Sequence, residues 1–85
     1  MNLVKRNIPS HEYIVLKHKD EIIIDHKINR YYTIISGVVK VKKINIENNC
    51  LDIMLIKFSD TIKLKSNNYH CYSFQALTSS KILGR

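Results

Sequence analysis

Glycine, proline, tryptophan and cysteine are all scarce in this chain of 85 residues, which has two glycines, one proline, two cysteines and no tryptophan. So few glycines leave no Gly-rich loop that could hold a phosphate through backbone N–H groups. The two cysteines, Cys50 and Cys71, have no CxxC spacing, which excludes a disulfide framework or zinc ribbon and predicts reduced thiols. Apolar runs are far shorter than the ~18 residues of a membrane span, and no signal-peptide pattern is present. We therefore expect one small domain that is neither embedded in a membrane nor secreted.

Acidic residues are also few, seven against fourteen basic ones, so the formal net charge is +7. Such an excess is typical of proteins that bind nucleic acid. However, lysines outnumber arginines by eleven to three, and isoleucine, lysine and asparagine make up 33 of the 85 residues. These three amino acids have AT-rich codons, whereas proteins that bind nucleic acid usually recruit arginine for its planar fork. The composition favours an AT-biased genome, such as that of a plastid or a reduced endosymbiont, over a dedicated basic groove.

β-Branched and aromatic residues dominate the rest of the chain, in short alternating runs that polar turns separate. No segment has the 3.6-residue apolar stripe of a helix, and no internal repeat is visible. Seven or eight short strands in one domain (residues 1–85, with 1–11 as a loose N-terminal arm) predict an all-β sandwich or jelly roll. We expect the strands within residues 12–17, 21–25, 31–36, 38–46, 50–58, 59–68 and 69–83.

Alternation also predicts which side chains share a face of each strand. Val39 and Val41 oppose Lys40 and Lys42. In the next strand, one face is expected to hold Leu51, Ile53 and Leu55, and the other to hold Asp52, Met54 and Ile56. Gly37 follows a run of residues that prefer extended backbone, so it predicts a corner or tight turn between two strands.

Four histidines raise the question of a metal site, but the chain has no H-x-H pair of the kind that a metal-binding β-barrel uses. His18 and His26 fall in predicted polar turns, where solvated side chains are expected, and His11 lies near the N-terminus. His70 and Cys71 are neighbours on opposite faces of a strand and cannot form a catalytic pair. A catalytic pair of Cys50 with His70 remains geometrically possible. We expect no metal site and no enzyme.

The segment "NRYYTIISGVVKVKKI" (29–44) resembles the strand–glycine–strand signature of the effector domain in cyclic-AMP-receptor-type transcription regulators (the CRP/FNR superfamily). The flanking "KDEIIIDHK" and "NCLDIMLIKF" are placed like the neighbouring strand and hairpin arm of that family. The resemblance covers about residues 13–83. Its matching positions are Tyr32, Ile34, Ile35, Gly37, Lys40 and Val41.

The tail "NYHCYSFQALTSSKILG" is most like the nitrogen-control regulators of cyanobacteria and red-algal plastids, through Tyr69, His70 and Phe74 and, approximately, Thr78. The resemblance implies a cyclic-nucleotide-binding-like, antiparallel β-roll, a cupin-like double-stranded β-helix in which Gly37 is a structural corner. It also implies a small effector, either a cyclic nucleotide or 2-oxoglutarate. The expected location is a red-algal-type plastid stroma or a bacterial cytoplasm.

Two departures from the family matter. The family's effector cassette contains a glycine-bearing turn, a short helix and an arginine, but the corresponding "SDTIKLKSNN" (59–68) has neither glycine nor arginine. Asn67 or Asn68 falls near the arginine position, so Lys63 and Lys65 are the candidate partners of an anionic effector. The sequence also ends at Arg85 without the family's dimerisation helix and helix-turn-helix, so we expect no sequence-specific DNA contact from this chain alone.

The leading hypothesis is therefore a truncated or degenerate sensory domain of a nitrogen-control transcription regulator, in which effector binding is an open question. The alternative is a stand-alone basic β-module that acts through protein contacts or non-specific binding to nucleic acid. Because the family's long helix would cover one side of the roll, a chain without it is expected to dimerise or self-associate.

Overall fold

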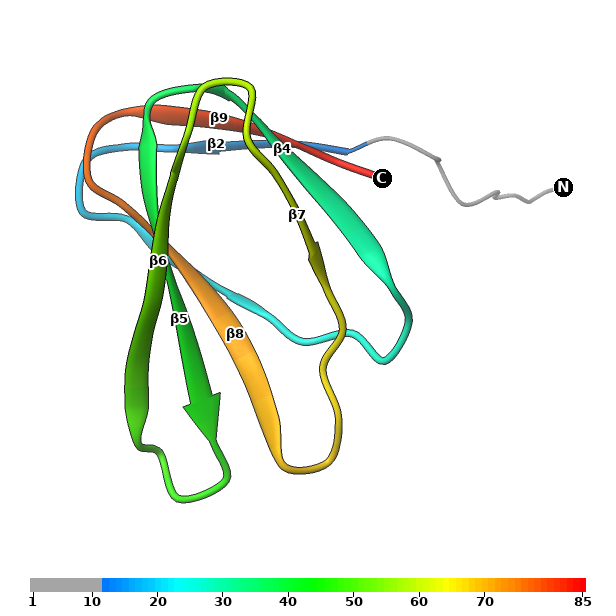
Figure 1. The fold of residues 1–85 in the computed structure, drawn as a ribbon. Coiled ribbons are helices and arrows are strands. Elements are labelled where there is room, and N and C mark those ends of the chain that lie inside the picture. Colours follow the sequence, from blue (N-terminus) through cyan, green and yellow to red (C-terminus); the bar gives the residue numbers. More distant parts are fainter. Residues whose placement is uncertain (1–11) are drawn as a thin grey trace, which may run out of the picture.

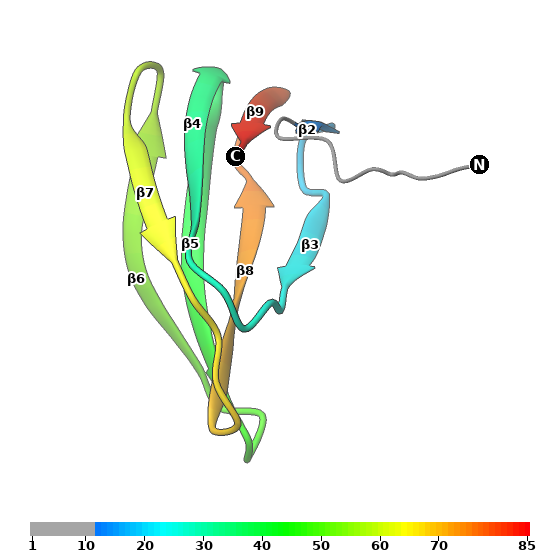
Figure 2. The same cartoon turned by 90° about the vertical axis from the view of Figure 1, so that its right-hand side faces the viewer.

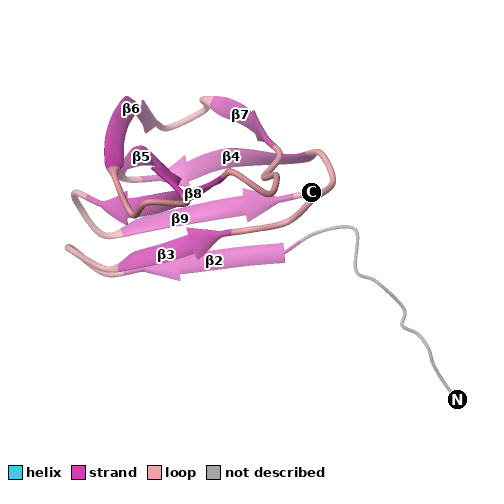
Figure 3. Cartoon of the chain, turned by 90° about the horizontal axis from the view of Figure 1, so that it is seen from below, coloured by secondary structure: helices cyan, strands magenta, loops and turns pink. Residues whose placement is uncertain are grey.

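Residues 12–85 are described by the structure, a computed structural model, and they consist of strands and loops (Figures 1 and 3). The expected N-terminal arm, residues 1–11, lies outside these residues. Within residues 12–85 there is no helix long and apolar enough to cross a membrane. The strands are β2 (Glu12–Leu16), β3 (Glu21–Ile24), β4 (Arg30–Ser36), β5 (Val38–Asn45), β6 (Cys50–Lys57), β7 (Thr61–Leu64), β8 (His70–Ala76) and β9 (Ser80–Gly84).

The strands form two four-stranded antiparallel sheets, with the orders β2-β9-β4-β7 and β3-β8-β5-β6. Four pairs of consecutive strands each turn a corner and place one strand in each sheet (Figure 2). These pairs are β2–β3, β4–β5, β6–β7 and β8–β9. The β5–β6 loop closes a hairpin, whereas the β3–β4 and β7–β8 loops cross from one sheet to the other. The predicted all-β, antiparallel β-roll is thereby confirmed.

Branched aliphatic side chains from both sheets fill the space between them. Phe74 is fully buried, and its ring meets Tyr32 edge-on with 5.1 Å between the ring centroids. An edge-to-face contact of this kind adds to the stabilisation from apolar burial. The buried core consists of Leu16, Ile24, Tyr32, Ile34, Val39, Val41, Ile56, Leu64, Phe74, Ala76 and Ile82.

Gly37 forms the corner between β4 and β5, with a positive φ of 89°. A Cβ at this position would lie 2.7 Å from the Cα of Ser80 and would overlap the Ser80 hydroxyl and the Ser79 carbonyl oxygen. Both the backbone conformation and the close approach of the β8–β9 corner therefore require glycine here.

The β2–β3 and β6–β7 corners have the same local structure, although the sequence shows no repeat. In the first, Asp20 Oδ2 accepts a hydrogen bond from the Lys17 N–H, and the Asp20 N–H donates to the Lys17 carbonyl, both at 2.9 Å. Asp60 and Lys57 form the same two bonds, also at 2.9 Å. The third residue of each turn has a positive φ, 78° and 73° respectively. The roll is thus an internal repeat of two halves that share a turn of the form Lys-x-x-Asp.

A register shift in β6 overturns the face that we predicted for Asp52. Val41 lies opposite Met54 but Lys42 lies opposite Asp52, so Ile53 is an extra residue in a β-bulge. The bulge turns Asp52 to the outer face, where its carboxylate is 3.4 Å from Lys40 Nζ. The prediction that Asp52 shares a face with Met54 was wrong because simple alternation contains no bulge.

Candidate functional site

The inner face of the β3-β8-β5-β6 sheet changes from apolar to polar along β5 and β8. Val39 and Val41 are fully buried, and the next two residues on the same side of β5 are Lys43 and Asn45. On β8, Phe74 is followed toward the same end by inward-facing Tyr72 and His70, which lie opposite Lys43 and Asn45. The sheet therefore ends in polar side chains at the open end of the roll, which we call the mouth. The mouth is lined by Lys43, Asn45, Asn49, Cys50, Leu51, Tyr69 and His70.

Lys43 is the notable residue of the mouth, because it is half-buried and has no ion pair with any residue in the range 12–85. A half-buried lysine without a carboxylate partner can offer its positive charge to an anion. The cavity at the mouth has a volume of about 520 Å³, which lies in the range of small-molecule sites. The arrangement is therefore suited to a small anionic ligand.

The polar groups beside Lys43 are held in place by local hydrogen bonds. Asn45 Oδ1 accepts from the N–H groups of Glu47 and Asn49, at 2.9 and 3.0 Å, and so shapes the β5–β6 loop. His70 Nε2 lies 3.3 Å from the Tyr72 hydroxyl, and the two rings meet edge-on. These contacts hold the imidazole of His70 and the amide of Asn45 in the lining of the mouth, which they share with Lys43.

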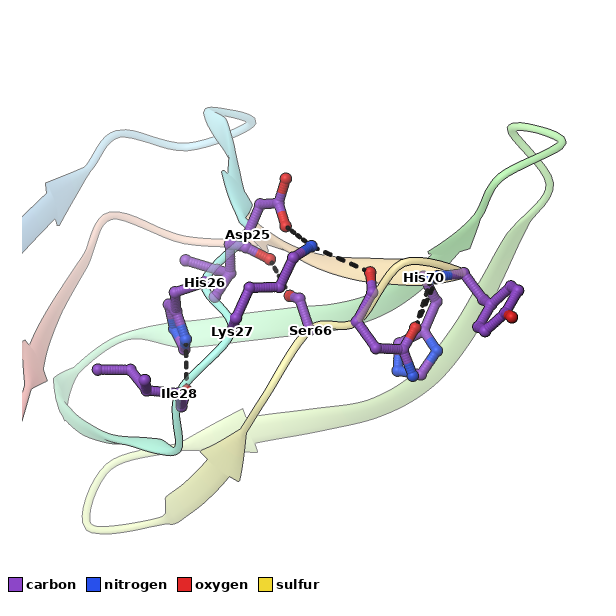
Figure 4. Close-up of polar contacts among 9 residues, drawn as sticks. Asp25, His26, Lys27, Ile28, Ser66 and His70 are labelled. Atoms are coloured by element: carbon purple, nitrogen blue, oxygen red, sulfur yellow. Dashed lines mark hydrogen bonds and ion pairs between the residues drawn. The ribbon is translucent and has the colours of Figure 1, made fainter.

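A second hollow, of about 270 Å³, lies beside the mouth and shares Asn45, Tyr69 and His70 with it. Here the β3–β4 and β7–β8 loops are bonded to each other (Figure 4). Lys27 Nζ donates to the Asn67 carbonyl at 3.2 Å and pairs with Asp25 at 3.6 Å, and the Ser66 N–H donates to the His26 carbonyl at 2.8 Å. Because Asp25 neutralises Lys27, this hollow is less suited to an anion than the mouth.

A third hollow, of about 410 Å³, lies between β2 and β3, where the two sheets separate. Arg30 faces this hollow, half-buried, with its guanidinium 3.6 Å from Glu12 and over the ring of Tyr32. Burial raises the pKa of the Tyr32 hydroxyl, and Arg30 opposes that shift. Arg30 is the one inward-facing arginine of the described strands, but its carboxylate partner leaves it little free charge for a ligand.

His26 is not the solvated turn residue that we predicted. Its ring is half-buried, with Nδ1 2.8 Å from the Ile28 carbonyl and Nε2 2.7 Å from the Tyr32 hydroxyl. Since a carbonyl only accepts, Nδ1–H donates to Ile28, and in the neutral ring Nε2 accepts from Tyr32. His26 therefore anchors the β3–β4 loop to the core. His18, in contrast, is exposed in its turn, as expected.

Cys50 and His70 both line the mouth, whereas Cys71 lies on the other face of β8, facing the second hollow. Burial raises the pKa of the Cys71 thiol, and Asp25 adds to the shift. Both effects disfavour the reactive thiolate. No cluster of three or more metal-ligating side chains occurs among residues 12–85.

The structure does not place inside the roll the two lysines that the sequence indicated for an anionic effector. Lys63 lies opposite Tyr31 on the outer face of β7, and Lys65, which follows that strand, is exposed. Lys43 was overlooked, although the alternation of Val39 and Val41 with Lys40 and Lys42 already places residue 43 on the valine side. The same alternation, continued one residue beyond Lys42, predicts an inward Lys43.

No protein-family model matches the sequence. No match is found among the curated proteins. Solved structures, however, share its fold. The cupin domain of Drosophila melanogaster CENP-C has a TM-score of 0.70 and 14% identity, over 94% of this chain and 62% of that one.

Two transcription regulators have the same fold at slightly lower scores. The sensor domain of the transcriptional regulator DNR from Pseudomonas aeruginosa has a TM-score of 0.65 and 16% identity, over 88% of this chain and 53% of that one. The CO-dependent transcription factor CooA from Carboxydothermus hydrogenoformans has a TM-score of 0.60 and 16% identity, over 88% of this chain and 33% of that one. At these identities the likeness shows the fold, and the chain spans less than two thirds of each of these structures.

Proposed function

We propose that this chain is the sensory β-roll of a transcription regulator and that a small anionic effector binds at its mouth. The observation that carries the proposal is Lys43, a half-buried cation without an ion pair among residues 12–85, in a cavity of about 520 Å³. In this proposal the ammonium group supplies the charge, and His70 and the Asn49 amide supply hydrogen bonds.

The effector that we propose is 2-oxoglutarate, in a regulator of the nitrogen-control type. Support comes from the tail residues Tyr69, His70 and Phe74, which resemble that branch of the family, and from the likeness of the fold to sensor domains. Tyr69 and His70 also line the mouth. A dicarboxylate is a suitable ligand for this position because one carboxylate can reach Lys43 while the other remains near the open end.

The test is a titration of the ¹⁵N-labelled chain with 2-oxoglutarate, followed by amide chemical shifts. We expect shifts that saturate and that concentrate at Lys43, Asn49 and His70, with weaker changes for cyclic AMP. Lys43→Met should reduce the affinity about tenfold or more, because a charged hydrogen bond contributes about 1.5–3 kcal/mol. Lys57→Met removes an exposed lysine from β6 and is the matched control. Equal losses in both variants, or shifts spread over the whole surface, would refute the proposal.

A further inference from the structure

The outer face of the β2-β9-β4-β7 sheet carries a row of two cations around an exposed tyrosine. Tyr31 of β4 lies opposite Lys63 of β7. On its other side Tyr31 exchanges both backbone hydrogen bonds with Arg85, just past β9, at 2.9 and 2.8 Å. Residues directly opposite in an antiparallel pair point to the same face. Arg85, Tyr31 and Lys63 therefore form one row across three strands.

A second cation and ring lie on the same face. Lys81 of β9 is opposite Val15 and places its Nζ 4.7 Å from the centre of the Tyr13 ring. The two tyrosines are well exposed, at 61% for Tyr13 and 47% for Tyr31. In the next row of the same face, Leu83 of β9 lies opposite both Tyr13 and Thr33, and Thr33 forms a side-chain hydrogen bond with Thr61 of β7. We call Tyr13, Tyr31, Lys63, Lys81 and Arg85 the basic face.

The basic face lacks compensating acids, whereas the opposite outer face has them. Glu12 is the one acidic residue within β2, β9, β4 and β7, and it lies on the inner side, opposite Gly84 and paired with Arg30. Lys63, Lys81 and Arg85 have no ion pair with any residue in the range 12–85.

On the outer face of the other sheet, both lysines of β5 have carboxylate partners. Lys40 pairs with Asp52 at 3.4 Å, and Lys42 pairs with Glu21 at 3.6 Å. On that outer face only Lys57 of β6 has no ion pair within residues 12–85, whereas all three cations of the basic face are without one.

We propose that the basic face binds single-stranded nucleic acid. Unpaired lysine and arginine side chains attract the phosphates, and exposed tyrosine rings stack with unpaired bases. A four-stranded sheet with outward aromatic rings suits a single strand. The major groove of a duplex, in contrast, admits a helix or a two-stranded ribbon. The basic face lies on the outside of the roll and the mouth on its inner side, so this proposal does not rest on effector binding.

The test is fluorescence anisotropy with the full chain and a labelled 20-nucleotide oligothymidylate. Three phosphate contacts predict a roughly 20-fold loss of affinity between 50 and 200 mM salt. Lys63→Glu and Lys81→Glu should each weaken binding at least tenfold. Lys57→Glu changes the net charge equally but lies on β6, so it should change the affinity less than threefold.

The contribution of the rings is tested at Tyr31. Tyr31→Phe should keep the affinity and Tyr31→Ala should reduce it about tenfold, because stacking on an aromatic ring contributes about 1–3 kcal/mol per base. If Tyr31→Ala does not fold, amide shifts of the unmodified chain with oligothymidylate provide the same information, and they should map to β4, β7 and β9. The proposal is overturned if Lys57→Glu weakens binding as much as Lys63→Glu. It is also overturned if duplex DNA or vesicles with anionic lipid bind more tightly than the single strand.

Discussion

At the scale of single residues, a methyl group at Gly37 has no room, because it would overlap Ser79 and Ser80 across the corner. The φ of 89° adds backbone strain for any residue with a Cβ. We expect Gly37→Ala to lower the free energy of unfolding by about 3 kcal/mol or more. Urea denaturation followed by circular dichroism measures the change. Ser36→Ala, at the exposed neighbouring position, should stay within about 0.5 kcal/mol, and an unchanged midpoint for Gly37→Ala would contradict the prediction.

Cys71 allows a prediction of pH dependence. Because burial and Asp25 raise the pKa of its thiol, less thiolate is present at neutral pH than for an ordinary cysteine, whose pKa is about 8.5. In a Cys50→Ser variant, the rate of reaction with iodoacetamide should therefore be slow at pH 7.5 and should continue to rise to a higher pH than for an ordinary cysteine. Mass spectrometry of the labelled chain measures this rate.

The control for Cys71 is the same reaction in urea, where its environment is lost. The rate at pH 7.5 should then increase, because the thiol returns to an ordinary pKa in the unfolded chain. Equal rates in the folded and unfolded chains would show that the environment of Cys71 does not protect the thiol.

At the scale of elements, the two Lys-x-x-Asp corners should contribute equally to stability. Asp20 and Asp60 each accept a 2.9 Å hydrogen bond from a backbone N–H. We expect Asp20→Ala and Asp60→Ala each to lower the free energy of unfolding by about 1–2 kcal/mol. Asp52→Ala, which removes an exposed ion pair with Lys40, should cost about 0.5 kcal/mol or less. Thermal unfolding of the three variants side by side tests this, and a clear difference between the two corner variants would contradict the equivalence of the halves.

The strands themselves could be predicted from the sequence, because alternation of β-branched and charged residues is a local property. The bulge at Ile53 could not, since it depends on how β6 meets β5. Nor could the repeated turn, because "KHKD" and "KFSD" share only their first and last residues and each requires positive φ at a residue other than glycine. His26 was misjudged because its partner, Tyr32, comes from the strand after the loop.

The candidate anion site shows why the inner and outer faces could not be assigned from the sequence. Lys63 is in the segment that corresponds to the family's effector cassette, yet its strand turns it outward, opposite Tyr31. The inward cation, Lys43, comes from β5 instead. The choice between inner and outer faces depends on the pairing of distant strands, which a pattern within one strand does not contain.

At the scale of the whole molecule, the edge strand β6 is the feature that governs association. Ile56 is its one buried residue. The strand leaves four apolar residues with relative exposures from 40% to 66%, namely Leu51, Ile53, Met54 and Leu55. An apolar strand at the edge of a sheet favours pairing with other chains. We expect the chain to self-associate, and Leu55→Lys to shift it toward the monomer.

Sedimentation velocity over a range of concentrations measures this shift. Val15→Lys adds the same charge and removes an exposed apolar residue from the other sheet, so it serves as the control. It should leave the self-association unchanged. A monomer at all concentrations in the unmodified chain would contradict the prediction.

The position of β9 has a consequence for biosynthesis. β9 lies between β2 and β4, and Glu12 is paired with Gly84. A ribosome delivers the chain from its N-terminus, so β2 and β4 emerge early and must wait for the strand that separates them. The first sheet cannot assemble while Ser80–Gly84 are still inside the exit tunnel. Because nearly all strand pairs join distant segments, folding is expected to be slow for so short a domain. Until it is complete, the apolar residues of β6 are available to chaperones.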